Sequence, residues 1–203
     1  MEKIKICIFG DSIAWGVDDK EKGGWPARLR KYFETNGFNV KITNLGVCGD
    51  NTDDLLKRFK TEAAAREPNV IIFAIGTNDS QYVDTKNNPR ISLEKFQKNL
   101  NELFSQAKGF TPKIIFVGLT KVDEIKTTPI PWNKRKYYTN ENIAQYNSAI
   151  KAFCEENEIL FIDMLDLLDK DDLGDGLHPD SQSHQKMFER VKNFLLENKL
   201  VEK

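Results

Sequence analysis

The chain has few of the residues that mark disulfide-rich, metal-bound or membrane-spanning proteins. Its three cysteines, Cys7, Cys48 and Cys154, are scattered and form no CxxC pair. An odd, scattered set predicts neither a disulfide framework nor a zinc site, and it is typical of reduced thiols in the cytoplasm. No apolar run approaches the roughly 18 residues that a membrane-spanning helix needs.

Neither sign of charge is in excess. The 30 Lys and Arg residues balance 31 Asp and Glu residues, which leaves a formal net charge of −1 among 203 residues. This balance gives no electrostatic reason to expect nucleic acid or a membrane surface as partner. Residues 1–4 lead straight into an expected strand without the apolar core of a signal peptide, so we expect a cytoplasmic protein.

Several loop signatures are also missing. Neither G-x-G-x-x-G nor a Walker motif occurs, and Ala14 breaks the G-x-S-x-G pattern around Ser12. The segment Asp11–Trp15 is poor in the Gly, Ser and Thr that cradle phosphates. These absences argue against a non-catalytic binding module, which stays an alternative, and we expect no cofactor.

The chain does contain a regular alternation of two patterns. Length and composition (39% hydrophobic, 30% charged) suit a single globular domain over residues 1–203. Five apolar runs predict strands, at Ile4–Phe9, Val40–Leu45, Val70–Ile75, Lys113–Gly118 and Leu160–Ile162. Five amphipathic patterns predict helices, at Trp25–Asn36, Thr52–Arg66, Ser92–Lys108, Asn140–Asn157 and Ser181–Asn198. This alternation predicts an α/β fold with helices on both faces of a parallel sheet.

Three long loops follow expected strands and should meet at the carboxyl edge of that sheet, where ligands bind in such folds. They are Ala14–Gly24, Asp79–Ile91 and Lys121–Thr139. We expect them to form walls of a substrate pocket, although aromatic residues in loops also serve as packing anchors. The pocket candidates are Asp11 and the aromatic residues Trp15, Tyr82, Trp132, Tyr137 and Tyr138.

A serine and an Asp/His pair supply the most specific chemistry. Ser12 follows the first apolar run directly, and Asp175 lies three residues before His178. Serine becomes a nucleophile when an imidazole takes its proton and a carboxylate orients that imidazole. The other histidine, His184, has no such partner in sequence, and we predict a surface position for it.

Two further segments offer donors for a developing negative charge. Asn44–Thr52 contains Gly46 and Gly49, and Ile75–Asp79 contains Asn78. A glycine lets a backbone N–H approach a ligand, and an Asn side chain can donate as well. Each segment alone is also ordinary turn chemistry.

Together these residues resemble the four blocks of the SGNH, or GDSL, hydrolase superfamily, in its order and over nearly the whole chain. The blocks are Gly10-Asp11-Ser12, Gly49, Gly76-Thr77-Asn78-Asp79 and Asp175-Gly176-Leu177-His178-Pro179. The resemblance implies a flavodoxin-like three-layer α/β/α fold. It implies Ser12 as nucleophile, His178 as base and Asp175 as orienting acid. The oxyanion donors would be the N–H groups of Ser12 and Gly49 and the Asn78 side chain. We prefer Gly49 to Gly46 because Gly49-Asp50-Asn51-Thr52 immediately precedes a predicted helix.

The resemblance implies hydrolysis of esters, thioesters or acyl groups on lipids, sugars or small alcohols, with no metal. An acyltransferase with the same triad is the nearest alternative, because nothing in the sequence separates the two. Cys48 is a weaker candidate nucleophile. The acidic stretch Asp163–Asp175 lacks EF-hand spacing and is predicted to be a solvated loop.

Overall fold

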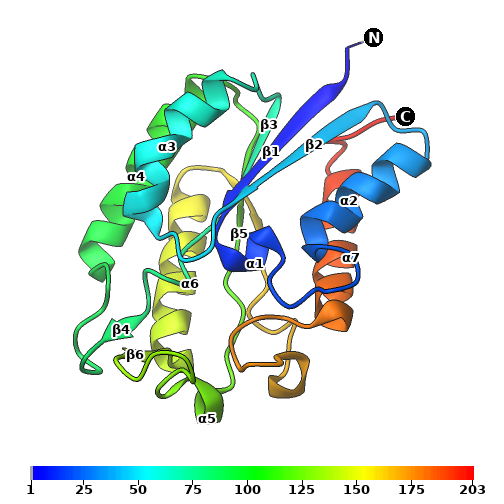
Figure 1. The fold of residues 1–203 in the computed structure, drawn as a ribbon. Coiled ribbons are helices and arrows are strands. Elements are labelled where there is room, and N and C mark those ends of the chain that lie inside the picture. The colour runs from blue at the N-terminus through cyan, green and yellow to red at the C-terminus, as the bar shows by residue number, and fades with distance from the viewer. Residues whose placement is uncertain (1) are drawn as a thin grey trace.

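Five parallel strands form the central sheet, in the order β2-β1-β3-β5-β7 (Figure 1). The computed structural model describes residues 2–203. The strands are β1 Ile4–Gly10, β2 Val40–Gly46, β3 Val70–Ala74, β5 Ile114–Val117 and β7 Leu160–Ile162. This is the flavodoxin-like order of a doubly wound sheet. All five predicted strands are confirmed, with ends that differ by at most one residue.

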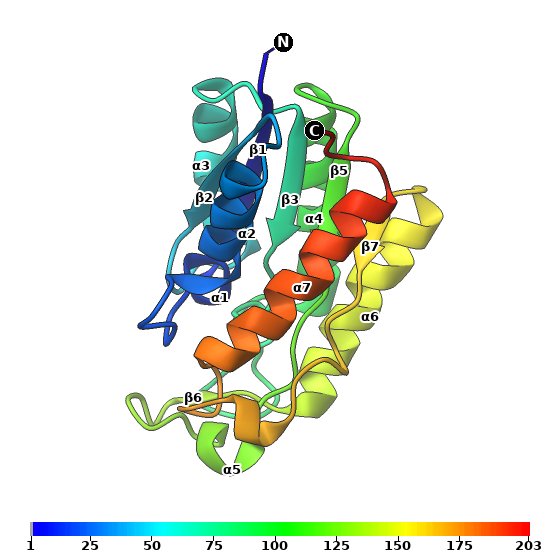
Figure 2. The same cartoon turned by 90° about the vertical axis from the view of Figure 1, so that its right-hand side faces the viewer.

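Helices cover both faces of the sheet, which confirms the predicted three layers. Figure 2 shows α2 and α7 on the face turned to the viewer, while α3, α4 and α6 lie on the other. The long helices are α2 Gly24–Thr35, α3 Thr52–Ala64, α4 Leu93–Lys108, α6 Asn140–Glu156 and α7 Ser181–Glu197. The sequence did not predict the short elements α1 Ser12–Trp15, β4 Tyr82–Val83, α5 Glu124–Thr127, β6 Lys136–Tyr137 and a 3-10 turn at Lys170–Asp172. None of the helices within residues 2–203 is long and apolar enough to cross a membrane.

The two-residue period of β1 divides the core into two clusters. Cys7 and Phe9 point toward α3, α4 and α6, whereas Ile6 and Ile8 point toward α2 and α7. All four side chains are almost completely buried. A strand covered on both faces has consecutive apolar residues, here Ile6–Phe9, which is why β1 was recognisable in the sequence.

The strand register brings three loop segments to one edge of the sheet. Gly10 at the end of β1 pairs with Gly46 of β2 on one side and with Ala74 of β3 on the other. The residues that follow these strands therefore begin side by side. A Cβ on Gly10 would overlap the Ala74 carbonyl, so this close approach requires glycine. The β4–β6 ribbon and α5 lie at the same end of the molecule (Figure 1).

Candidate active site

A chain of two hydrogen bonds joins Ser12, His178 and Asp175. The Ser12 Oγ atom lies 2.9 Å from His178 Nε2, and His178 Nδ1 lies 2.6 Å from Asp175 Oδ2. Ser12 and His178 are each 8% exposed, so the hydroxyl and imidazole are shielded but reachable. An imidazole held on one side by a carboxylate and facing a hydroxyl on the other can accept the hydroxyl proton.

The turn after β1 fixes Ser12. Asp11 is the N-cap of α1, and its Oδ1 accepts a hydrogen bond of 2.9 Å from the Ile13 N–H. Gly16 ends this single turn in the left-handed conformation, with φ 103°. Burial raises the pKa of Asp11 to about 6 despite that backbone bond. Ser12 is thus the first residue of a helical turn, where its own N–H has no intrahelical acceptor.

A tight turn fixes the carboxylate and imidazole. Asp175 Oδ1 accepts hydrogen bonds of 2.8 Å from the N–H groups of Leu177 and His178. Gly176 has φ +91°, and its carbonyl accepts from the Asp123 N–H at 2.8 Å. Burial alone would raise the pKa of Asp175, but the His178 side chain and these two N–H groups outweigh it and lower the pKa. The carboxylate therefore stays ionised beside the imidazole.

The segment after β2 presents Gly49 to the same site. Gly49 has φ +85°, and its N–H has no hydrogen-bond partner within residues 2–203. The Gly46 N–H, in contrast, donates to Asn44 Oδ1 at 2.9 Å. Asn78 Nδ2 donates one proton to the Asp50 carbonyl at 2.9 Å, and within residues 2–203 its second proton has no acceptor.

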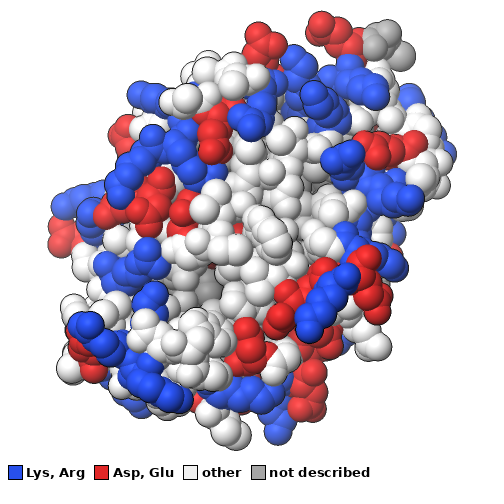
Figure 3. All heavy atoms as spheres, viewed as in Figure 1, with Lys and Arg blue, Asp and Glu red and all other residues white. Residues whose placement is uncertain are grey.

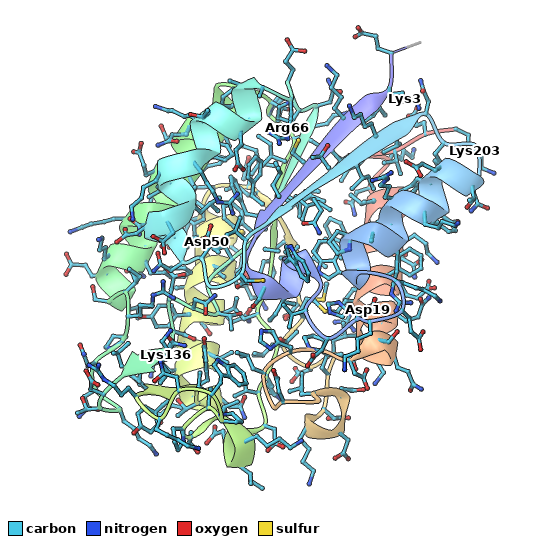
Figure 4. The ribbon with its side chains drawn as sticks, in the orientation of Figure 1. Lys3, Asp19, Asp50, Arg66, Lys136 and Lys203 are labelled. Atoms are coloured by element: carbon cyan, nitrogen blue, oxygen red, sulfur yellow. The ribbon has the colours of Figure 1, made fainter. Side chains whose placement is uncertain are left out.

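Charged side chains that the sequence did not single out hold this segment in place. Arg58 binds Asp50 Oδ2 at 2.7 Å and the Gly10 carbonyl at 3.2 Å, and so joins the segment to the end of β1. Arg90 donates to the Gly49 carbonyl at 2.8 Å. Figure 4 shows Asp50 at the start of α3. Only long-range contacts distinguish these arginines from the chain's other basic residues, so no local pattern could have found them.

Asp79 closes the segment from the other side. Its carboxylate accepts from the N–H of Thr52 at 3.1 Å and from the Thr52 hydroxyl at 2.5 Å. Asn99 of α4 donates to the same hydroxyl at 2.8 Å. Burial raises the pKa of Asp79 to about 7 in spite of the Thr52 bonds. This clamp ties the end of the Asn78 segment to the start of α3.

A cavity of about 310 Å³ opens over Ser12. The residues that line it are Ser12, Val17, Cys48, Gly49, Asn78, Gln81, Ile130, Trp132, Lys136, Tyr138, Leu177 and His178. Trp132 is 55% exposed and stacks on the His178 ring, with centroids 5.9 Å apart. In Figure 3 the middle of the face is mostly white, that is, formed by residues other than Lys, Arg, Asp and Glu, and charged side chains surround it.

Four of the six predicted pocket residues lie elsewhere. Asp11 is buried and uses its carboxylate to cap α1. Trp15 is 55% exposed at the end of α1 and does not line the cavity, and neither does Tyr82, which pairs with Tyr137 in the β4–β6 ribbon. Tyr137 does not line the cavity either, whereas Trp132 and Tyr138 do.

His184 is the clearest correction to the sequence-based expectations. The prediction of a surface position is wrong, because this side chain is completely buried. Its Nδ1 accepts from the Trp25 N–H at 3.3 Å, and its Nε2 donates to the Val17 carbonyl at 3.1 Å. Burial lowers the pKa of His184. The ring therefore joins α7 to two segments of the N-terminal third of the chain.

Two other groups near Ser12 have less suitable chemistry. Burial raises the pKa of the Cys48 thiol, and the carboxylates of Asp11 and Asp50 raise it further, which disfavours the thiolate. Asp18, Asp175 and His178 bring one ligand-type atom each within 4.8 Å of one another. Both nitrogens of His178 already bind Asp175 and Ser12, so a cation there would have to break that chain.

A hydroxyl–imidazole–carboxylate chain at the carboxyl edge of a parallel sheet is the arrangement of a serine hydrolase. Residues 8–186 match the GDSL-like Lipase/Acylhydrolase family, and the chain belongs to that family.

Individual proteins and solved structures are similar to this chain over different shares of its length. The esterase TesA of Pseudomonas aeruginosa is 23% identical over 188 residues, which cover 92% of this chain and 85% of TesA. The uncharacterized lipoprotein YqeF of Bacillus subtilis is 31% identical over 123 residues, covering 59% of this chain and 49% of that lipoprotein. A catalytic mutant of Axe2, an acetylxylan esterase from Geobacillus stearothermophilus, shares the fold with a TM-score of 0.75 at 19% identity, covering 97% of this chain and 95% of that one.

Proposed function

We propose that the protein, as one domain over residues 1–203, is a serine ester hydrolase in which Ser12 is the nucleophile, His178 the general base and Asp175 the acid that orients it. The hydrogen-bond chain from Asp175 through His178 to Ser12 carries this proposal. Family membership and the esterases among the relatives support the reaction class.

In the proposed reaction, Ser12 Oγ attacks the ester carbonyl while its proton passes to His178 Nε2. The tetrahedral oxyanion is stabilised by the N–H groups of Ser12 and Gly49 and by the free Nδ2 proton of Asn78. His178 then protonates the leaving alcohol. A water molecule, activated by the same imidazole, releases the acyl group from Ser12 and restores the hydroxyl.

The cavity suits a small substrate. With a volume of about 310 Å³, it lies at the lower end of the range for ligand pockets. Its lining mixes apolar side chains such as Ile130 and Leu177 with the polar side chains of Gln81 and Lys136. We propose esters with a short acyl group, with acetylated sugars and lysophospholipid-like esters as the two further classes to compare. The proposal places the enzyme in the cytoplasm, where the exposed thiol of Cys48 would stay reduced.

The first experiment is hydrolysis of p-nitrophenyl acetate, butyrate, octanoate and palmitate by the wild type, Ser12→Ala and the control Ser105→Ala. Ser105 lies on the exposed side of α4. We expect activity with the shorter esters that falls by about 10³-fold or more in Ser12→Ala and is unchanged in Ser105→Ala. Equal activity in Ser12→Ala and wild type would exclude Ser12 as the nucleophile.

A serine-directed fluorophosphonate gives a second readout that does not depend on the substrate. Labelling of Ser12 in a protein that hydrolyses none of the esters, but acylates an added alcohol, would favour the acyltransferase. Absence of both labelling and hydrolysis would favour a binding module.

A further inference from the structure

The loop of residues 121–139 reaches the candidate oxyanion hole through one side chain, Tyr138. The ring is 2% exposed, and its hydroxyl donates to Asn78 Oδ1 at 2.7 Å. The backbone of Tyr138 is fixed to α5, because its N–H donates to the Thr127 carbonyl and its carbonyl accepts from the Thr127 hydroxyl, both at 3.0 Å. The phenol therefore meets the Asn78 amide from a rigid support.

One backbone carbonyl sets the direction of the hydrogen bonds that join Asn78, Tyr138 and Gln81. The Asp50 carbonyl can only accept, so the Nδ2 group of Asn78 must face it and Oδ1 must face Tyr138. Oδ1 in turn only accepts, so Tyr138 must donate to it. The Tyr138 oxygen is then free to accept from Gln81 Nε2, which lies 2.5 Å away.

Gln81 gives further evidence for the direction of the hydrogen bond from Tyr138 to Asn78. Gln81 is buried, and its Oε1 has no hydrogen-bond partner within residues 2–203. Turning the Gln81 amide over would give Oε1 a donor, but only by drawing the Tyr138 proton away from Asn78. The observed arrangement keeps all three hydrogen bonds of the cluster and leaves the unpaired atom at its far end.

This orientation matters for the proposed reaction. With Oδ1 held by Tyr138 and one Nδ2 proton held by Asp50, the second Nδ2 proton is the part of the amide left for the cavity that Asn78 and Ser12 line together. A flipped amide would present an oxygen to the oxyanion instead. A donor on Oδ1 also polarises the amide and strengthens its N–H groups as donors.

We propose that Tyr138 is a positioning residue for the oxyanion hole, which fixes and polarises the Asn78 amide so that Nδ2 donates to the developing oxyanion. This rests on the proposed function of Ser12 and Asn78. Trp132, from the same loop, stacks on His178. The loop of residues 121–139 therefore touches both the proton-transfer and the oxyanion side of the site.

The test is a double-mutant cycle between Tyr138→Phe and Asn78→Ala, with Tyr137→Phe as matched control. Tyr137 is the neighbouring half-buried tyrosine, and the described contacts give its hydroxyl no hydrogen bond. We expect Tyr138→Phe to lower kcat and kcat/KM equally, by about 3- to 15-fold, with KM unchanged. In the Asn78→Ala background the same change should alter kcat by less than about 2-fold. Tyr137→Phe should leave both backgrounds unchanged.

Two results would overturn the proposal. One is an equal fall of kcat in both backgrounds, because Tyr138 would then not act through Asn78. The other is a rise in KM with kcat intact, because the hydroxyl would then bind substrate. If Tyr138→Phe does not fold, Gln81→Met replaces it, because this variant removes the donor to the Tyr138 hydroxyl. We expect Gln81→Met to lower kcat by less than Tyr138→Phe would. This fall must likewise vanish in the Asn78→Ala background.

A readout without turnover separates this proposal from the proposed function. In protein labelled with ¹⁵N-asparagine, the Asn78 side-chain resonance is assigned by its loss in Asn78→Ala. It should shift in Tyr138→Phe and stay in place in Tyr137→Phe. A wild type without esterase activity but with this shift would contradict the function and keep the contact. An active wild type whose Asn78 resonance ignores Tyr138→Phe would contradict the positioning role alone.

Discussion

His178, in the loop before α7, and His184, in the first turn of α7, lie six residues apart and use the same side chain in opposite ways. Both nitrogens of His178 bind side chains that can exchange protons, the Ser12 hydroxyl and the Asp175 carboxylate. Both nitrogens of His184 bind backbone groups, the Trp25 N–H and the Val17 carbonyl. A backbone N–H cannot give up its proton and a carbonyl cannot take one, so His184 is locked in a single neutral tautomer.

The comparison shows that partners, rather than residue type or burial alone, decide what a histidine does. His178 is 8% exposed and lines the cavity over Ser12, whereas His184 is 0% exposed and does not line that cavity. One ring is placed to move a proton, and the other to join three segments of the chain. The same substitution at the two positions should therefore separate activity from stability.

The largest effect is expected for His178→Leu. Without the imidazole, nothing takes the Ser12 proton, and kcat should fall by at least about 10³-fold. The backbone bonds from residues 177 and 178 to Asp175 remain, so the free energy of unfolding should change by about 1 kcal/mol or less. Ester hydrolysis and urea denaturation measure the two quantities. A loss of stability large enough to explain the loss of activity would break the comparison.

Local sequence patterns were sufficient to predict the five strands of the central sheet and the five long helices. Buried strands such as β1 are continuous apolar runs, and the parallel alternation of strands and helices places their carboxyl ends at one edge. Ser12 and the Asp175/His178 pair could be found because each adjoins a recognisable strand end or turn. Gly49 could be chosen over Gly46 because it precedes a helix.

What the sequence did not reveal depends on contacts between distant segments. Tyr138 forms a hydrogen bond with Asn78, which lies 60 residues earlier in the chain. The loop that carries Tyr138 has no periodicity, so the sequence around one residue does not predict its contact with the other. For His184 a signal was present: it lies three, seven and eleven residues before the buried Met187, Val191 and Leu195. That spacing continues the apolar stripe of α7 and predicts a buried ring. The prediction of a surface position rests on the lack of an acidic neighbour, which says nothing about burial.

The second prediction is the opposite of the first, a loss of stability with little change in activity. His184→Leu fills the same space but leaves the Trp25 N–H and the Val17 carbonyl buried without partners, which should lower the free energy of unfolding by about 2–4 kcal/mol. In the fraction that remains folded, kcat should stay within about a factor of three of the wild type, because the Ser12–His178–Asp175 chain does not include this ring. Urea denaturation and active-site-titrated kcat test both parts. An unchanged denaturation midpoint would show that the two backbone bonds contribute nothing.

The smallest expected effect is the pH dependence that His184 adds to stability. Burial lowers its pKa in the folded protein from the ordinary value of 6.5. As the pH falls below 6.5, the unfolded chain takes up a proton that the folded protein refuses, so the stability due to the neutral ring is present above pH 6.5 and is lost on acidification. Asp11 and Asp79 act in the opposite sense, because their raised pKa values, about 6 and about 7, let the folded protein take protons first. Both carboxyl groups are present in the wild type and in His184→Leu, so the difference between the two proteins isolates the imidazole.

Urea denaturation at pH 7.5, 6.5, 5.5 and 5.0 measures this difference. The free energy of unfolding of the wild type should exceed that of His184→Leu by less and less as the pH falls. A difference that is constant across this range would mean that His184 can accept a proton in place, which its two backbone partners forbid.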